Sequence, residues 1–147
     1  MREVTVAATQ MACGADEAEN IDRAEALVRR AAAQGAQIIL LQELFESRYF
    51  CQDEDPEDLF RARPATNHPT LARFAKLASE LQVVLPVSFY ELAGQARFNT
   101  VAVIDTNGAQ LGLYRKTHIP HGAGYQEKYH FSPGDTGRGM SRPVLKL

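Results

Sequence analysis

Apolar runs alternate with helical patterns along most of the chain. Short apolar or β-branched runs predict strands at residues 4–11, 38–41, 83–89, 98–105 and 109–115. Residues 17–34 and 70–81 instead place apolar side chains at i, i+3 and i+4, which predicts two amphipathic helices. The resulting order, β-α-β-α-β-β-β, predicts a layered α/β domain built on a mixed sheet.

The residues between these elements predict where several of them end. Asp16 can cap the first helix, and Gly35 can end it. Asn107-Gly108 between two apolar runs is a strong hairpin signal. Residues 53–58 are acidic and predict an exposed loop or a short helix.

Composition and charge exclude several classes of protein. A length of 147 residues fits one domain, and a share of 45% apolar residues is ordinary for a globular protein. A net charge of −2 offers no basic surface for nucleic acid or an anionic membrane. No apolar run approaches the ~20 residues of a membrane helix, and the chain enters a strand at once instead of a signal peptide. Two cysteines are too few for a disulfide framework. We therefore predict a cytoplasmic protein without nucleic-acid or membrane partners.

Glu43 and Lys116 each stand where an apolar run stops. Functional groups collect at the carboxyl ends of strands in open α/β sheets, so we expect the two side chains to meet. Together they could act as a base that activates a nucleophile and a cation that stabilises an oxyanion. A plain salt bridge between two strand ends explains the pattern equally well.

Four segments resemble one enzyme family. Residues 40–45 (Leu-Leu-Gln-Glu-Leu-Phe) and 114–120 (Tyr-Arg-Lys-Thr-His-Ile-Pro) resemble the first two catalytic segments of the nitrilase superfamily of carbon–nitrogen hydrolases. Residues 46–52 (Glu-Ser-Arg-Tyr-Phe-Cys-Gln) and the stretch 124–137 look like the branch that contains the N-carbamoylputrescine amidases. The segments follow the family's order, and the resemblance covers residues 3–137.

The resemblance implies a fold and a reaction. The implied fold is the N-terminal half of a nitrilase-type α-β-β-α sandwich, with a mixed sheet and helices on one face. The implied reaction is hydrolysis of N-carbamoylputrescine to putrescine, carbon dioxide and ammonia in polyamine biosynthesis, by a Glu-Lys-Cys mechanism. Glu43 matches the general base, Lys116 the oxyanion-stabilising lysine, and Glu127 a second glutamate that positions substrate and lysine. The family implies small amide or carbamoyl-amine substrates, no metal or organic cofactor, and homo-oligomers at full length.

Three further residues are candidate substrate contacts. Tyr49 and Phe50 closely follow the proposed base and could flank an aliphatic diamine, although ordinary aromatic packing explains them equally well. His121 lies in the later glycine-rich loop, at a position where the family pattern has Asp. The spacing of His118, His121 and His130 is not that of a metal site.

The sequence offers no candidate nucleophile. Cys51 precedes Lys116, lies beside an acidic loop that would raise the pKa of its thiol, and matches a non-catalytic position of the family. Cys13 is expected to be a small, half-buried side chain. We therefore predict that this chain alone has no amidase activity.

The chain departs from the family pattern at its end. We expect residues 1–137 to form the N-terminal part of a carbon–nitrogen hydrolase domain and 138–147 to form a divergent or truncated tail, with a last apolar run at 143–147. The second half of the family's domain has no counterpart in this sequence, so we expect the sheet face that it would cover to stay exposed. This apolar face should cause poor solubility or self-association. Two alternatives remain, namely another amidase of the same family with a different substrate, and a non-catalytic interaction module.

Overall fold

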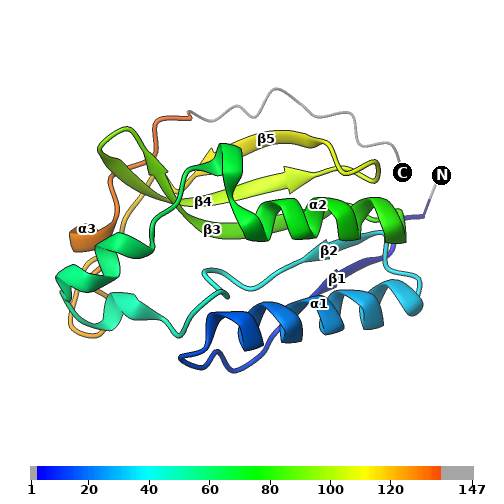
Figure 1. The fold of residues 1–147 in the computed structure, drawn as a ribbon, viewed down its shortest axis with the longest axis horizontal. Helices are drawn as coiled ribbons and strands as arrows, with labels where there is room; N and C mark the ends of the chain where they lie inside the picture. The colour runs from blue at the N-terminus through cyan, green and yellow to red at the C-terminus, as the bar shows by residue number, and fades with distance from the viewer. Residues whose placement is uncertain (1–2, 137–147) are drawn as a thin grey trace.

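The computed structural model describes residues 3–136, which form the predicted mixture of helices and strands (Figure 1). The predicted apolar run at 143–147 and the tail from 138 lie outside the described residues. In chain order the elements are β1 (Val6–Ala8), α1 (Glu17–Ala33), β2 (Ile38–Leu40), η1 (Phe50–Gln52), η2 (Pro56–Arg61), η3 (Ala65–Asn67), α2 (Pro69–Leu81), β3 (Leu85–Ala93), β4 (Ala96–Ile104), β5 (Gln110–Arg115) and α3 (Glu127–His130).

The described strands lie edge to edge in the order β1-β2-β3-β4-β5. β1 pairs with β2 in parallel, and β3, β4 and β5 form an antiparallel meander. The two groups are joined by a parallel bridge between Ile38 and Val84 and by a hydrogen bond of 3.3 Å from Leu41 N to Pro86 O. The predicted mixed arrangement of strands is therefore confirmed.

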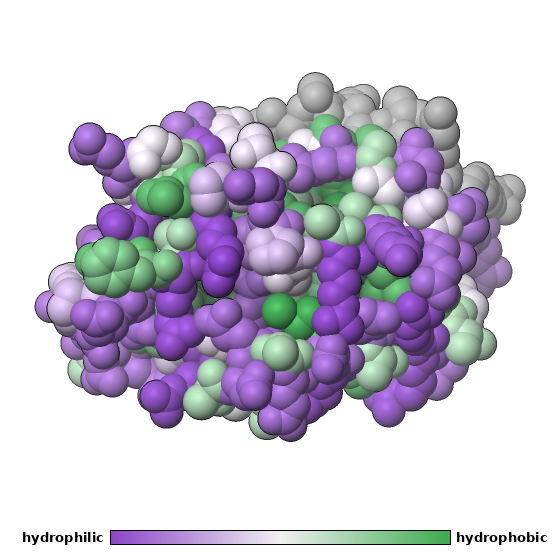
Figure 2. Space-filling view, in the orientation of Figure 1, coloured by the Kyte–Doolittle hydropathy of each residue, from purple (hydrophilic) through white to green (hydrophobic). Residues whose placement is uncertain are grey.

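Helices α1 and α2 lie side by side over one face of these strands (Figure 1). Their apolar stripes meet the inward-facing strand residues in one core, whose fully buried members include Val28, Ile39, Phe74, Leu85 and Val87. The surface seen in the same orientation is mostly hydrophilic, with scattered hydrophobic side chains (Figure 2). The helices thus turn their apolar sides inward, as their i, i+3, i+4 spacing predicts.

The described residues leave the opposite face of the strands uncovered. Ile39 is fully buried, whereas its neighbour Leu40 is 48% exposed, because successive strand residues point to opposite faces. Val6 on β1 and Tyr114 on β5 are also exposed. Leu40, Val101 and Tyr114 line one shallow cavity, which places them on the same side. We call this surface, defined by Val6, Leu40, Val101 and Tyr114, the open face.

Sequence signals at the ends of elements are confirmed. The Asp16 carboxylate caps α1 by accepting a 3.1 Å hydrogen bond from Glu19 N, and Gly35 beyond the helix has a φ of 90°. Gly108 closes the β4–β5 hairpin with a φ of 81°. A Cβ atom at Gly108 would lie 2.7 Å from the Ala75 carbonyl oxygen, so the hairpin packs on α2 only with glycine there.

Among the α-helices and strands, three differ clearly from the prediction. β3 begins two residues later and ends four residues later than the predicted strand at 83–89. β1 is shorter than the predicted strand at 4–11, because the chain leaves the sheet and Met11 N donates to the side chain of Gln42 at 3.0 Å. Helix α3 was not predicted, because a single turn has no apolar periodicity to detect. Residues 53–58, predicted as a loop or short helix, include the start of η2.

A second apolar cluster holds the loops beside the sheet. Its buried members are Leu44, Phe50, Cys51, Ala62, Tyr90, Ile119 and Phe131. The cluster joins residues 44–62 to residues 119–131. It therefore brings together the segments that carry Glu43 and Glu127, which lie far apart in the sequence.

Candidate active site

The backbone of Lys116 is fixed on both sides. Lys116 directly follows β5, and its N–H donates to Asn99 O on β4 at 2.8 Å. The Lys116 carbonyl accepts a hydrogen bond of 2.9 Å from Gly134 N. A Cβ atom at Gly134 would overlap the Arg115 carbonyl, so only glycine allows this approach. The ammonium of Lys116 therefore projects from a backbone that has little freedom to move.

Glu43 is presented by a tight turn after β2. Leu44 adopts a left-handed conformation with a φ of 51°, and its N–H donates to Ser88 Oγ on β3 at 2.9 Å. The Glu43 carboxylate accepts a hydrogen bond of 2.6 Å from Asn99 Nδ2. A positive φ at a non-glycine residue is strained and often accompanies a functional site. β3 and β4 thus orient the turn and the carboxylate.

Lys116 connects Glu43 to Glu127. Its Nζ atom lies 3.1 Å from Glu43 Oε1 and 2.8 Å from Glu127 Oε2. The hydroxyl of Tyr49 donates to the other Glu127 oxygen at 2.8 Å. The Glu127 side chain is only 5% exposed, whereas that of Glu43 is 54% exposed. Glu127 is therefore an internal anchor of the lysine, and Glu43 is the carboxylate that faces outward.

The charges in this cluster support one another. Partial burial lowers the pKa of Lys116, but hydrogen bonds to Glu127 and Glu43 outweigh burial, so the pKa lies above its ordinary value. A cavity of about 240 Å³ opens beside the pair on the open face, lined by Leu40, Leu41, Glu43, Ser88, Asn99, Val101, Tyr114 and Lys116. A fixed ammonium and an accessible carboxylate thus border a mostly apolar hollow. This arrangement can accept a proton and stabilise a developing negative charge.

The thiols of both cysteines have raised pKa values. Cys51 is fully buried, and burial followed by the negative charges of Glu127 and Glu43 raises the pKa of its thiol to about 12. Burial is thus the main cause of the raised pKa of Cys51, and the acidic loop at residues 53–58 contributes less. The thiol of Cys13 accepts a hydrogen bond from Gln42 Nε2 at 3.5 Å, and burial also raises its pKa.

The other predicted site residues have different environments. Tyr49 reaches the cluster through its hydroxyl, and burial followed by its bond to Glu127 raises the pKa of that hydroxyl. Phe50 stacks on Tyr90 with ring centroids 5.1 Å apart and packs edge-on against His130. His121 is exposed. The structure therefore joins Tyr49 to Glu43, Lys116 and Glu127, but places Phe50 in the second apolar cluster.

Two positioning residues were missed by sequence reasoning. Asn99 holds the Glu43 carboxylate through its side chain and Lys116 through its backbone. Arg115 forms a two-fold ion pair with the buried Glu91, with N–O distances of 2.7 and 2.6 Å, and also binds Asp135. The sequence gives a weak signal for Asn99, because a polar residue inside an apolar run often has a specific hydrogen-bond partner.

Neither a metal cluster nor a membrane span is found in the described part of the chain. Among residues 3–136, no group of three or more His, Cys, Asp and Glu side chains is placed to hold a metal ion. No helix in that range is both long and apolar enough to cross a bilayer. A second cavity in this range, of about 630 Å³ around residues 48–63, is not lined by Glu43, Lys116 or Glu127.

Comparison with known proteins gives consistent matches. The family model described as carbon–nitrogen hydrolase matches residues 5–146. The N-carbamoylputrescine amidase of Arabidopsis thaliana is 57% identical over 92% of this chain and 46% of its own length. The citrullinase of Francisella tularensis is 42% identical over 93% of this chain and 48% of its own length. The chain thus spans about half the length of the curated relatives it matches.

Solved structures share the fold. A carbon–nitrogen hydrolase from Helicobacter pylori aligns with a TM-score of 0.85 at 32% identity, covering 91% of this chain and 46% of that chain. A mutant amidase from Nesterenkonia sp., in which acrylamide has added to the active-site cysteine, aligns with a TM-score of 0.73 at 25% identity. That alignment covers 90% of this chain and 50% of the amidase.

Proposed function

Because this chain belongs to the carbon–nitrogen hydrolase family, we propose that it supplies the base and the oxyanion-stabilising cation of an amidase acting on N-carbamoylputrescine. The observation that carries this proposal is the Lys116 ammonium held between Glu43 and Glu127 at the edge of the open face. A merely structural salt bridge would not require an anchoring carboxylate, a tyrosine and an asparagine to fix its two ends.

Glu43 and Lys116 would divide the reaction between them. Glu43 takes the proton of an incoming thiol, and the thiolate adds to the carbonyl carbon of the substrate. Lys116 stabilises the negative oxygen of the tetrahedral intermediate. Glu43 gives its proton to the departing amine or ammonia, which leaves an S-carbamoyl thioester on the cysteine. Glu43 then removes a proton from water, and the water hydrolyses the thioester to the free thiol and a carbamic acid. The carbamic acid decomposes to carbon dioxide and the remaining ammonia or amine. Carbamoylputrescine and one water thus become putrescine, carbon dioxide and ammonia.

The nucleophile in this proposal comes from outside the residues described. Cys13 and Cys51 are the only cysteines of the chain, and burial raises the pKa of both thiols, which disfavours the nucleophilic thiolate. The relatives are about twice as long as the matched region, and the open face borders the hollow beside Glu43. We infer that the second half of such a domain covers the open face and brings the cysteine to Lys116.

The substrate class rests on two relatives. N-carbamoylputrescine and citrulline both end in a ureido group on an aliphatic chain, so a shared ureido site is compatible with both names. The higher identity to the N-carbamoylputrescine amidases favours the diamine over the amino acid. A simple amide such as glutamine is the substrate class that this proposal ranks last.

Reconstitution tests the proposal. The 147-residue chain is purified together with the second half of the Arabidopsis thaliana enzyme, and release of putrescine and ammonia is measured. We expect turnover of N-carbamoylputrescine by the pair and none by the chain alone. Citrulline and glutamine are assayed in parallel, and a preference for citrulline would transfer the assignment to that substrate.

A matched pair of variants separates chemistry from assembly. Lys116→Met should lower turnover by about 10²–10³-fold without preventing the two halves from binding. Lys76→Met, which removes an exposed lysine of α2, should leave turnover unchanged. A stable complex without turnover of any of the three substrates, or turnover by the chain alone, would contradict the proposal.

A further inference from the structure

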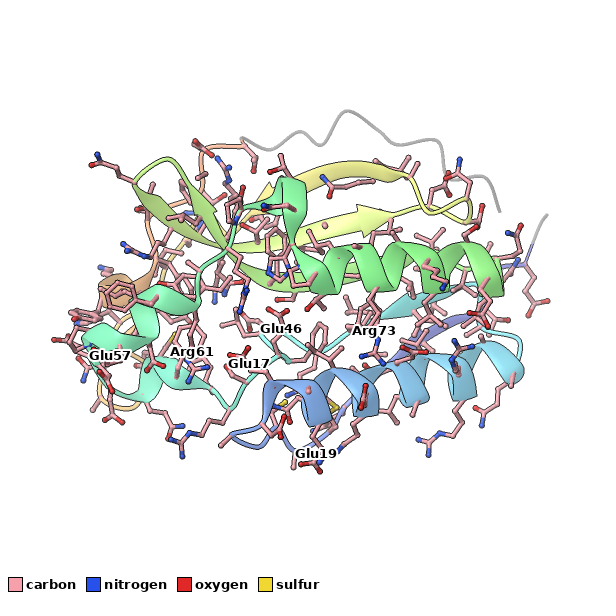
Figure 3. The ribbon with its side chains drawn as sticks, in the orientation of Figure 1. Glu17, Glu19, Glu46, Glu57, Arg61 and Arg73 are labelled. Atoms are coloured by element: carbon pink, nitrogen blue, oxygen red, sulfur yellow. The ribbon has the colours of Figure 1, made fainter. Side chains whose placement is uncertain are left out.

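Glu46 carries a largely buried carboxyl group that the proposed reaction does not use. It lies three residues after Glu43, between the start of α1 and α2, close to Glu17 and Arg61 (Figure 3). Its side chain is 20% exposed. One carboxyl oxygen accepts a hydrogen bond from the hydroxyl of Thr70 in the first turn of α2. The other faces His68 Nε2 at 3.8 Å, too far for a hydrogen bond.

His68 is a neutral imidazole in this setting. Its side chain is 2% exposed, it packs edge-on against Phe89, and its Nδ1 atom has no hydrogen-bond partner among the described residues. An imidazolium would bury two N–H donors without acceptors, which costs several kcal/mol relative to water. Burial and the positive charge of Arg63 accordingly lower the pKa of His68 to about 4.

Among residues 3–136, no ammonium or guanidinium group forms an ion pair with Glu46. Glu17 faces it from α1, Arg61 and Arg63 from the segment after η1, Tyr90 from β3, and His68 from the start of α2. Arg61 is already paired with Glu17 at 2.5 Å and with Asp58 at 2.6 Å. Burial is the largest influence on Glu46 and raises its pKa to about 7, against the bond from Thr70.

We propose that Glu46 is a positioning residue that holds the Glu43 turn in place as an uncharged carboxylic acid, bonded to Thr70 beside a neutral His68. The Thr70 hydroxyl donates to Oε1, and Oε2 is the oxygen that faces His68. The proposed function enters only through the role of Glu43, and the rest stands on the described contacts.

The turn is thereby fastened to three elements. Leu44 N donates to Ser88 on β3, the backbone oxygen of Glu46 accepts from Asn20 Nδ2 on α1 at 3.1 Å, and the Glu46 carboxyl binds Thr70 on α2. Ionising Glu46 would place an unpaired charge inside this junction. The turn would then be expected to open more often, and Leu44 N would lose its partner.

The pH dependence of the pair follows from the two shifts. The folded state raises the pKa of Glu46, so its stabilisation is lost as pH rises through about 7. The folded state lowers the pKa of His68 to about 4, so its contribution is lost as pH falls through about 4. At intermediate pH one proton sits on His68 in the unfolded chain and on Glu46 in the folded chain, and the two effects oppose each other.

Carbon-13 NMR of the wild-type chain tests the proton directly. The carboxyl carbon of Glu46 should titrate near pH 7, clearly above the exposed glutamates. The hydrogen-exchange protection of the Leu44 amide, referenced to the buried amide of Ile39, should fall by up to about tenfold per pH unit as pH rises from the ordinary glutamate range to about 7, and should level off above pH 7. Titration of Glu46 near the ordinary range of glutamate, or Leu44 protection independent of pH, would overturn the proposal.

Two variants show whether the uncharged state does the positioning. Glu46→Gln keeps the shape and removes the charge, so Leu44 protection should equal or exceed that of the wild type at about pH 6 and stay constant from about pH 7 to 8. Glu46→Ala should lower it at every pH. Loss of protection in Glu46→Gln at pH 6 would overturn the proposal. Because no measurement here uses turnover, failure of the reconstituted amidase would leave these results intact, and the reverse also holds.

Discussion

The two faces of the same strands differ in what they contribute. The face covered by α1 and α2 contains the fully buried side chains Ile39, Phe74 and Val87, so it supplies most of the burial that stabilises the fold. The open face exposes Val6, Leu40 and Tyr114 and carries the candidate site at its edge. Stability and chemistry are thus separated by the alternation of side chains along each strand.

The largest expected effect is on the free energy of unfolding, and it should differ between two neighbouring residues of β2. Ile39→Ala should lower the free energy of unfolding by about 2–5 kcal/mol, because it leaves a cavity under the helices. Leu40→Ala should change it by no more than about 1 kcal/mol, since Leu40 is half exposed on the open face. Urea unfolding of the 147-residue chain measures both. Equal losses would mean that the open face is covered in solution.

The next effect concerns the cation of the site. In the reconstituted amidase, Lys116→Met should lower kcat by about 10²–10³-fold, the usual cost of removing an oxyanion donor. Steady-state release of ammonia measures this change. A loss of less than about tenfold would reduce Lys116 to a structural partner of Glu127.

A smaller effect is expected at Asn99. Asn99→Ala removes the 2.6 Å hydrogen bond to Glu43 and should lower kcat/KM by about tenfold, at the low end for a bond to a charged group because that carboxylate meets water. Asn67→Ala, at an exposed position of η3, is the matched control and should leave the rate unchanged. Equal rates for both variants would show that water replaces the amide.

The smallest effect is expected in the second apolar cluster. Cys51→Ala should leave turnover of the reconstituted enzyme within about twofold and cost about 1 kcal/mol of stability, as a typical buried substitution does. Chemical labelling should find Cys51 unreactive in the folded chain. Loss of turnover in Cys51→Ala would make this thiol part of the chemistry and overturn its assignment as packing.

Local patterns predicted the scaffold better than the site's supporting contacts. The two helices and the β4–β5 hairpin follow from apolar spacing and from Asn107-Gly108, which are signals within a short stretch. The meeting of Glu43 with Lys116 follows from their places at strand ends, and the 3.1 Å contact agrees with that expectation. What these residues do in a reaction stays a prediction.

The supporting contacts depend on information that no local pattern contains. Asn99 meets Glu43 because β4 pairs with β3 in a register that places Asn99 opposite Tyr90. In the sequence, Glu46 is one of several polar residues in a loop. It becomes largely buried only when α2 packs against it. Such contacts between distant segments are fixed by the packing of the whole domain and not by spacing.

The contact between Gly134 and Lys116 also determines where this domain can be divided. Gly134 N binds the carbonyl of Lys116, and the missing side chain of Gly134 lets the two backbones touch. In a split protein or circular permutant, a cut upstream of Pro133 would separate Gly134 from the segment that contains Lys116. A cut placed after Thr136 would keep the hydrogen bond from Gly134 N to Lys116, along with the bond from Arg115 N to the Thr136 hydroxyl.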